Sequence, residues 1–92
     1  MQLERNVEGY LRRQVEKRGG RCYKFIPDIG NGMPDRIIVL PGGILVWVET
    51  KNGERKNARM LQKVQHRKLR SLGQRVEIAH TKAQVDALMR IL

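Results

Sequence analysis

Two apolar runs joined by a tight turn form the centre of the chain, which reads Pro34-Asp35-Arg36-Ile37-Ile38-Val39-Leu40-Pro41-Gly42-Gly43-Ile44-Leu45-Val46-Trp47-Val48-Glu49-Thr50-Lys51. The β-branched residues on both sides of the Pro-Gly-Gly turn predict a hairpin with strands at 35–40 and 44–50. With a turn at 41–43 the pairing is symmetric about Gly42, so Asp35 faces Glu49. Directly opposite residues lie on the same side of a sheet with Cβ atoms about 5 Å apart. The pattern therefore predicts two facing carboxylates.

Such a pair has a chemical consequence. Facing carboxylates repel, so a fold that keeps them needs a cation or a proton between them. Lys51 follows Glu49 by two residues and therefore projects to the same face of the strand. Hard divalent ions prefer oxygen ligands, which Asp35, Glu49 and the backbone carbonyl of Thr50 could supply, while Lys51 could hold an attacking water. Two acids and a lysine at one sheet edge indicate a metal-dependent nuclease.

Length and charge narrow the class of protein. A chain of 92 residues is expected to form one domain, 1–92. Its net charge of +10 predicts a polyanionic partner, most simply nucleic acid. An acidic membrane surface is a weaker alternative, because no helix combines a wholly apolar face with a Trp or Phe border. With no long apolar run, no signal peptide and a single cysteine, Cys22, we expect a soluble intracellular protein without membrane contact.

Hydrophobic periodicity predicts the remaining elements. Helices are expected at 2–18, 57–72 and 82–91, the last with Thr81 as its N-cap, and further strands at 21–26 and 74–79. A right-handed crossover would make the last strand parallel to the third. The expected fold is αβββαβα, a mixed sheet flanked by helices in the α/β (α+β) class. The residues expected to face inward are Leu3, Val7, Tyr10, Leu11, Val15, Met60, Leu61, Val64, Leu69, Leu72, Val85, Leu88 and Met89.

Basic residues on the second long helix suggest a surface for DNA. Four of them fall opposite its apolar stripe, which predicts contact with DNA phosphates when taken together with the net charge: Arg59, Lys63, Arg67 and Arg70. Lys24 is expected to add to this surface; a merely solvated helix face is the alternative. His66 and His80 lack a Cys or His partner at metal-ligand spacing and are not expected to act as general bases. Gly30-Asn31-Gly32 is not followed by Gly-Lys-Ser/Thr, so no P-loop is expected.

The chain also resembles a known family. Pro34-Asp35 followed by Glu49-Thr50-Lys51 is similar to the PD-(D/E)xK nuclease motif. The wider set resembles the stand-alone, phage-type VRR-NUC (virus-type replication-repair nuclease) domain over roughly residues 4–80. That set comprises Val7-Glu8-Gly9-Tyr10-Leu11, Gly19-Gly20-Arg21-Cys22-Tyr23-Lys24-Phe25, Gly32-Met33-Pro34-Asp35-Arg36, and Leu61-Gln62-Lys63 with His66, Leu69, Arg70 and Gly73.

The resemblance implies roles for individual residues. Asp35, Glu49 and Lys51 would be catalytic, Glu8 would be the acid of the first helix, and Gln62 would lie near the site. Spacing alone leaves Glu4 and Glu8 as alternatives for a water-mediated metal ligand, and the resemblance selects Glu8. Thr50 stands where the family often has Leu or Val, a change that a carbonyl ligand tolerates.

The resemblance also implies a function. It predicts a restriction-endonuclease-like fold, dependence on Mg²⁺ or Mn²⁺ without an organic cofactor, and structure-selective cleavage of DNA in replication or repair. Stand-alone members are similar to dimeric Holliday-junction resolvases, so a homodimer acting on branched DNA is expected. A flap, single-strand or restriction-type nuclease is one alternative. A non-catalytic basic DNA-binding module is another, although binding alone gives no reason to direct two acids toward a polyanion.

Overall fold

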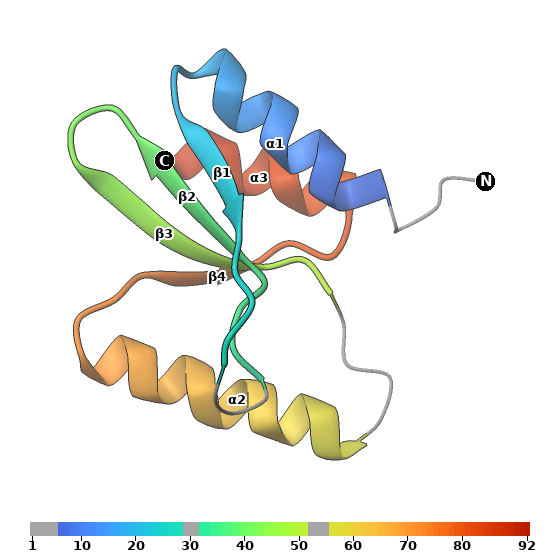
Figure 1. Ribbon diagram of the computed structural model, residues 1–92. Helices are drawn as coiled ribbons and strands as arrows, with labels where there is room; N and C mark the ends of the chain where they lie inside the picture. The colour runs from blue at the N-terminus through green and yellow to red at the C-terminus, as the bar shows by residue number, and fades with distance from the viewer. Residues whose placement is uncertain (1–5, 29–31, 52–55) are drawn as a thin grey trace.

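The computed structural model describes residues 6–28, 32–51 and 56–92, and its elements follow the predicted order. They are α1 (Val7–Lys17), β1 (Arg21–Lys24), β2 (Arg36–Leu40), β3 (Ile44–Glu49), α2 (Lys56–Ser71), β4 (Val76–Ile78) and α3 (Lys82–Ile91), as shown in Figure 1. The strands form one sheet in the order β1-β2-β3-β4. The first two pairings are antiparallel and β4 is parallel to β3, which confirms the predicted mixed sheet.

The register of the β2–β3 hairpin is the predicted one. Leu40 pairs with Ile44 at the turn and Arg36 pairs with Val48 at the far end. Gly42 and Gly43 both have positive φ, which only glycine adopts without strain. The ladder extends to Arg36, directly after Asp35, and β3 ends at Glu49. The two acids therefore lie together where the hairpin opens.

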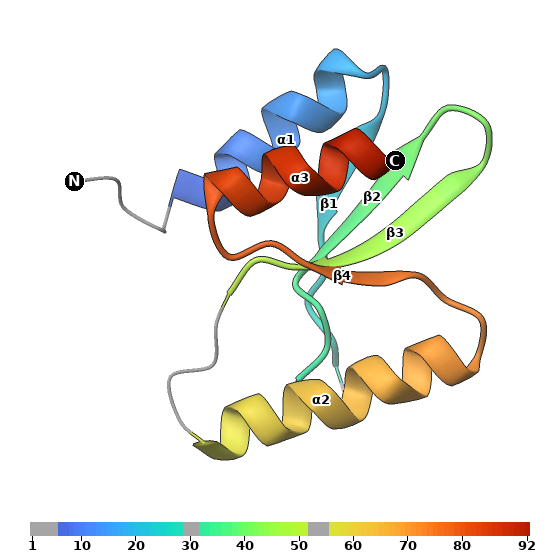
Figure 2. The same cartoon turned by 180° about the vertical axis from the view of Figure 1, so that it is seen from behind.

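The main hydrophobic core lies between the sheet and the pair α1 and α3, which cover the same face in Figures 1 and 2. The inward positions predicted for these helices are confirmed, since Val7, Leu11, Val15, Val85, Leu88 and Met89 are all buried. Leu3 and Glu4 lie outside the described residues.

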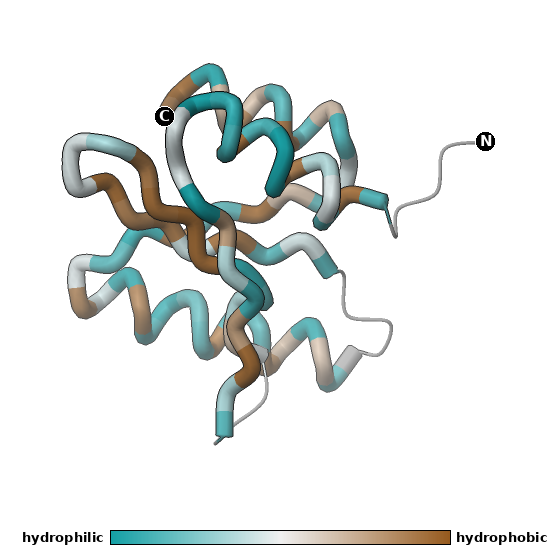
Figure 3. Tube along the Cα trace, turned by 45° about the horizontal axis from the view of Figure 1, so that its top comes forward, coloured by the Kyte–Doolittle hydropathy of each residue, from teal (hydrophilic) through white to brown (hydrophobic). Residues whose placement is uncertain are grey.

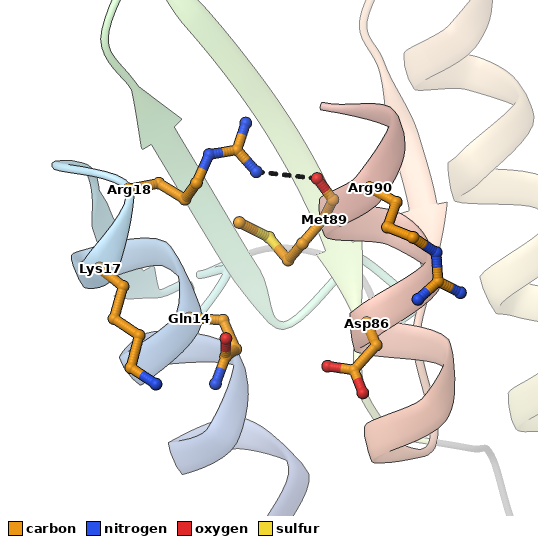
Figure 4. Close-up of a pocket in the computed structure, with 6 residues that line it drawn as sticks. All are labelled: Gln14, Lys17, Arg18, Asp86, Met89 and Arg90. Atoms are coloured by element: carbon orange, nitrogen blue, oxygen red, sulfur yellow. Dashed lines mark hydrogen bonds between the residues drawn. The ribbon is translucent and has the colours of Figure 1, made fainter.

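Polar contacts hold the two helices together at the end of the chain. Arg18 donates hydrogen bonds to the carbonyls of Met89 and Leu92, at 2.8 and 2.7 Å. Figure 4 shows the first of these bonds beside a hollow of about 450 Å³, lined by side chains of α1 and α3 and by Arg18. None of the predicted site residues lines this hollow, so we assign it no part in catalysis.

The ends of the helices explain their lengths. At the end of α1, Gly19 N–H bonds the carbonyl of Glu16 and Gly20 N–H bonds that of Val15, which is a Schellman motif with Gly19 at positive φ. Gly73 and Gln74 end α2 in the same way. At the start of α3, the Thr81 hydroxyl accepts a bond from Gln84 N–H, which confirms the predicted N-cap.

The opposite face of the sheet is covered only loosely by α2. The prediction that Met60, Leu61, Val64 and Leu72 point inward is wrong, because their exposed fractions are 54%, 40%, 41% and 77%. Leu72 lies beyond the last residue of α2, and the strands also leave Val39, Leu45 and Ile78 exposed. Figure 3 shows apolar residues concentrated in the strands and a largely hydrophilic α2.

Within the described ranges of the chain, no helix has both the length and the apolar character that a membrane crossing needs.

Candidate active site

Asp35 and Thr50 connect the two strands where the hairpin opens. The Thr50 backbone N–H donates to Oδ1 of Asp35 at 2.7 Å, and the Thr50 hydroxyl donates to Oδ2. Thr50 is buried, with 6% of its surface exposed. Its side chain therefore orients the Asp35 carboxylate, a role that Leu or Val at this position could not fill.

The loop before Asp35 is held against both β1 and α2. The Asp35 carbonyl accepts a hydrogen bond from Phe25 N–H at 2.9 Å, and Pro34 is fully buried. Gly32 has φ +89°, and a Cβ there would lie 2.4 Å from the Leu61 carbonyl carbon and 2.7 Å from Gln62 N. Only glycine satisfies both constraints, because the atoms that it meets belong to helix backbone. Figure 1 shows this connection reaching α2.

Glu49 is a buried acid, with only 2% of its surface exposed. Burial, followed by the Asp35 charge and a hydrogen bond with Asp35, raises its pKa to about 8. A hydrogen bond from the Lys51 backbone and the charge of Lys51 act in the opposite direction. Without a cation, Glu49 is therefore expected to keep its proton near neutral pH.

Lys51 and Gln62 meet at the end of β3. Lys51 is exposed, and its backbone carbonyl accepts a hydrogen bond from Gln62 Nε2 at 3.3 Å. The resemblance implies that Gln62 lies near the site, and this bond places it at the backbone of Lys51. Gln62 thus connects α2 to the residue beside Thr50.

Glu8 reaches the site through Arg36, which the sequence analysis did not single out. Arg36 is buried, with its NH2 atom 3.0 Å from Glu8 Oε2 and its NH1 atom 3.3 Å from Asp35 Oδ2. NH1 also donates to the Asp35 carbonyl at 2.9 Å. The sequence signal for this role of Arg36 is that it is a charged residue in an otherwise apolar strand. A charge buried at such a position needs a carboxylate partner.

Two histidines also approach the site. His66 Nε2 lies 3.6 Å from Glu49 Oε1, and only 4% of His66 is exposed. His80 Nδ1 lies 3.2 Å from the Thr50 carbonyl, which can only accept, so Nδ1 donates. Spacing to another histidine or cysteine does not reveal these contacts, because the carboxylate and carbonyl partners come from other elements.

Basic side chains line two hollows, one of which includes Arg36, the partner of Asp35, and the other His66, the neighbour of Glu49. A hollow of about 380 Å³ is lined by Glu8, Gly9, Arg12, Cys22, Lys24 and Arg36. A second, of about 270 Å³, is lined by Lys63, His66, Arg67, Arg70 and Ile78. Arg70 is exposed on α2, and its Nη2 atom also donates to the Val76 carbonyl at 2.9 Å. Arg59 lies exposed on α2 and lines neither of these two hollows.

Comparisons with known proteins agree with this geometry. A scan against protein-family models finds no match. The chain is 38% identical over 74 residues to "Putative nuclease p44" of Acyrthosiphon pisum secondary endosymbiont phage 1, covering 79% of this chain and 77% of that protein. A solved structure described as a VRR_NUC domain superposes with a TM-score of 0.76 at 27% identity, over 95% of this chain and 94% of the other. With this sequence match, this fold and its acids at the open end of the hairpin, the chain belongs to the VRR-NUC family of nucleases.

Proposed function

We propose that the protein is a metal-dependent endonuclease that hydrolyses phosphodiester bonds in branched DNA, as a Holliday-junction resolvase does. The observation that carries the proposal is the pairing of Asp35 with a buried Glu49, next to Thr50 and Lys51. Binding DNA would not favour two acids at this position, whereas binding a cation would. The family match to a phage protein named as a nuclease supports the same chemistry.

The donor set fits a hard divalent ion. No group of three or more His, Cys, Asp and Glu side chains is arranged to hold a metal among the described residues. Mg²⁺ commonly uses one or two carboxylates with carbonyl, water and phosphate oxygens, and Asp35, Glu49 and the Thr50 carbonyl would supply the protein's share. Among the described residues Glu49 Oε1 has no hydrogen-bond partner, so this carboxylate oxygen keeps lone pairs for a cation as well as for a neighbouring donor.

Each residue then has a defined part. When bound, Mg²⁺ or Mn²⁺ would offset phosphate charge and make a water more acidic. The Lys51 ammonium would orient the attacking water and oppose charge that develops on the phosphate. Gln62 would fix the Lys51 backbone through the bond to its carbonyl. Glu8 would act at the rim of the site and keep Arg36 against Asp35.

The two basic hollows suggest how DNA would approach. Lys24, beside Glu8, and Lys63, Arg67 and Arg70, beside His66, would contact phosphates on opposite sides of the cleaved bond. Arg59 would extend the second surface along α2. These contacts ignore base identity, which agrees with selection by DNA structure rather than by sequence.

Symmetric cutting of a four-way junction requires two sites, which implies a homodimer. The apolar residues exposed on α2 and on the neighbouring sheet face, which include Leu61, Val64, Leu45 and Ile78, are the surface that we assign to the partner. Sedimentation equilibrium should give twice the chain mass, and a monomer at micromolar concentration would contradict the dimer.

The test of the activity is cleavage of a labelled four-way junction. We expect nicking with Mg²⁺ or Mn²⁺ and none with EDTA, because the two acids alone cannot neutralise the phosphate. Flap, single-stranded and linear duplex substrates provide the comparison. Preference for a flap or for linear duplex would contradict junction selectivity, while binding to every substrate without cleavage in either metal would overturn the nuclease proposal.

A further inference from the structure

His66 and Glu49 form an unusual buried contact between α2 and β3. Their nearest atoms, Nε2 and Oε1, are 3.6 Å apart, slightly beyond hydrogen-bond distance. Both atoms are buried, and neither has a hydrogen-bond partner among the described residues. Since a buried polar group without a partner has lost its bonds to water, two such atoms facing each other are most simply the two ends of one hydrogen bond.

Chemistry fixes the direction of this bond in the loaded site. A carboxylate that ligates a cation is ionised and can only accept, so His66 must donate its Nε2–H. Because Nε2 is buried, this atom cannot reach a phosphate or an attacking water. No described trio of His and acidic side chains is arranged to hold a metal, so His66 is not placed as a direct ligand. His66 can therefore affect the metal site only through its contact with Glu49.

The position of His66 on α2 supports this role. His66 follows Gln62 by four residues, so both side chains project from one face of the helix. Gln62 holds the Lys51 carbonyl, and His66 faces the carboxylate of Glu49 two residues earlier. Because Met60, Leu61 and Val64 are half-exposed, apolar burial does not seat this part of α2 on the sheet. These polar contacts therefore align the helix with the end of β3.

We propose that His66 is a positioning residue, which donates Nε2–H to the Glu49 carboxylate and thereby orients it toward the divalent cation. The inference rests on the proposed function, because it assumes that Glu49 ligates the metal. Partners of this kind fix the orientation of ligands, and their loss typically weakens metal affinity 10- to 100-fold. We expect loss of the His66 donor to weaken metal binding by a factor in the same range.

Two amide substitutions separate the hydrogen bond from packing. The side-chain nitrogen of His66→Gln can reach the place of Nε2, whereas that of His66→Asn reaches only the place of Nδ1. Both variants keep a polar group in the buried site. We expect His66→Gln to bind Mn²⁺ within a few-fold of wild type and His66→Asn to bind it about 10- to 100-fold more weakly.

The measurement is Mn²⁺ titration of the full chain without DNA, followed by electron paramagnetic resonance of the free ion. Asp35→Asn serves as the control with a disrupted metal site. Urea unfolding of each variant checks its fold, and if His66→Asn is unfolded, His66→Leu takes its place. The inference is overturned if His66→Asn, or His66→Leu in its place, binds Mn²⁺ as tightly as wild type. It is also overturned if His66→Gln loses as much Mn²⁺ affinity as that variant does. If wild type itself binds no Mn²⁺, the proposed metal dependence fails and the inference fails with it.

Discussion

Lys51→Ala is expected to abolish most cleavage while leaving DNA binding almost unchanged. Removal of one group that stabilises charge in the transition state typically lowers the rate about 10²- to 10³-fold. We expect Lys51→Ala to lower the cleavage rate by at least this factor. The side chain is exposed, so its loss should not unfold the protein. It is also one of 19 lysines and arginines, so nonspecific attraction to DNA changes little.

The measurement is single-turnover cleavage of a junction with saturating protein, with binding measured separately in EDTA. Lys68→Ala is the matched control, because it removes the same charge from an exposed position on α2 outside both basic hollows. It should cleave at the wild-type rate. A Lys51→Ala variant that retains more than about a tenth of the wild-type rate would remove Lys51 from the catalytic role that we assign to it.

The hairpin was predictable because its information is local. The Pro-Gly-Gly turn fixes the centre of the pairing, and this determines every partner in the ladder from Leu40 with Ile44 to Arg36 with Val48. Asp35 lies directly before Arg36, and Glu49 lies directly after Val48. The exact contacts of the acids did not follow, since Thr50 binds Asp35 through its hydroxyl as well as its backbone.

The position of α2 was less predictable. Helical periodicity correctly places Met60, Leu61 and Val64 on one face, but it does not tell how closely another element approaches that face. In this chain the approach is limited, and these side chains stay half-exposed. Periodicity alone cannot distinguish a core-facing stripe from one that faces a second protein chain.

Arg36 and His66 were missed for a related reason. Each contacts an acid that is distant in the sequence, since Arg36 joins α1 to β2 and His66 joins α2 to β3. A search for spacing within one element finds neither contact. A charged or titratable residue on the buried side of an element is the available signal, and it becomes specific only when the tertiary arrangement supplies the partner.

Without metal, the protein should lose stability as pH rises from about 6.5 to 8. The folded pKa of Glu49, about 8, lies above its ordinary value of 4.5. Between these values the native state keeps a proton that the unfolded state has lost, so the free energy of unfolding falls with pH, by at most about 1.4 kcal/mol per pH unit for one group. Burial lowers the pKa of His66, which gives the opposite slope below about pH 6.5, so the higher window isolates Glu49.

Urea unfolding in EDTA across this window measures the slope, and Glu49→Gln is the control because its amide stays neutral. That variant should show little pH dependence and should be more stable than wild type at pH 8. A divalent cation should reverse the effect in wild type, since binding to Glu49 displaces the proton. Mg²⁺ should therefore stabilise wild type more at pH 8 than at pH 6.5 and leave Glu49→Gln almost unaffected. If wild type in EDTA showed the same stability at both pH values, Glu49 would not be a protonated acid in the metal-free site, and the need for a cation between the two carboxylates would lose its main physical support.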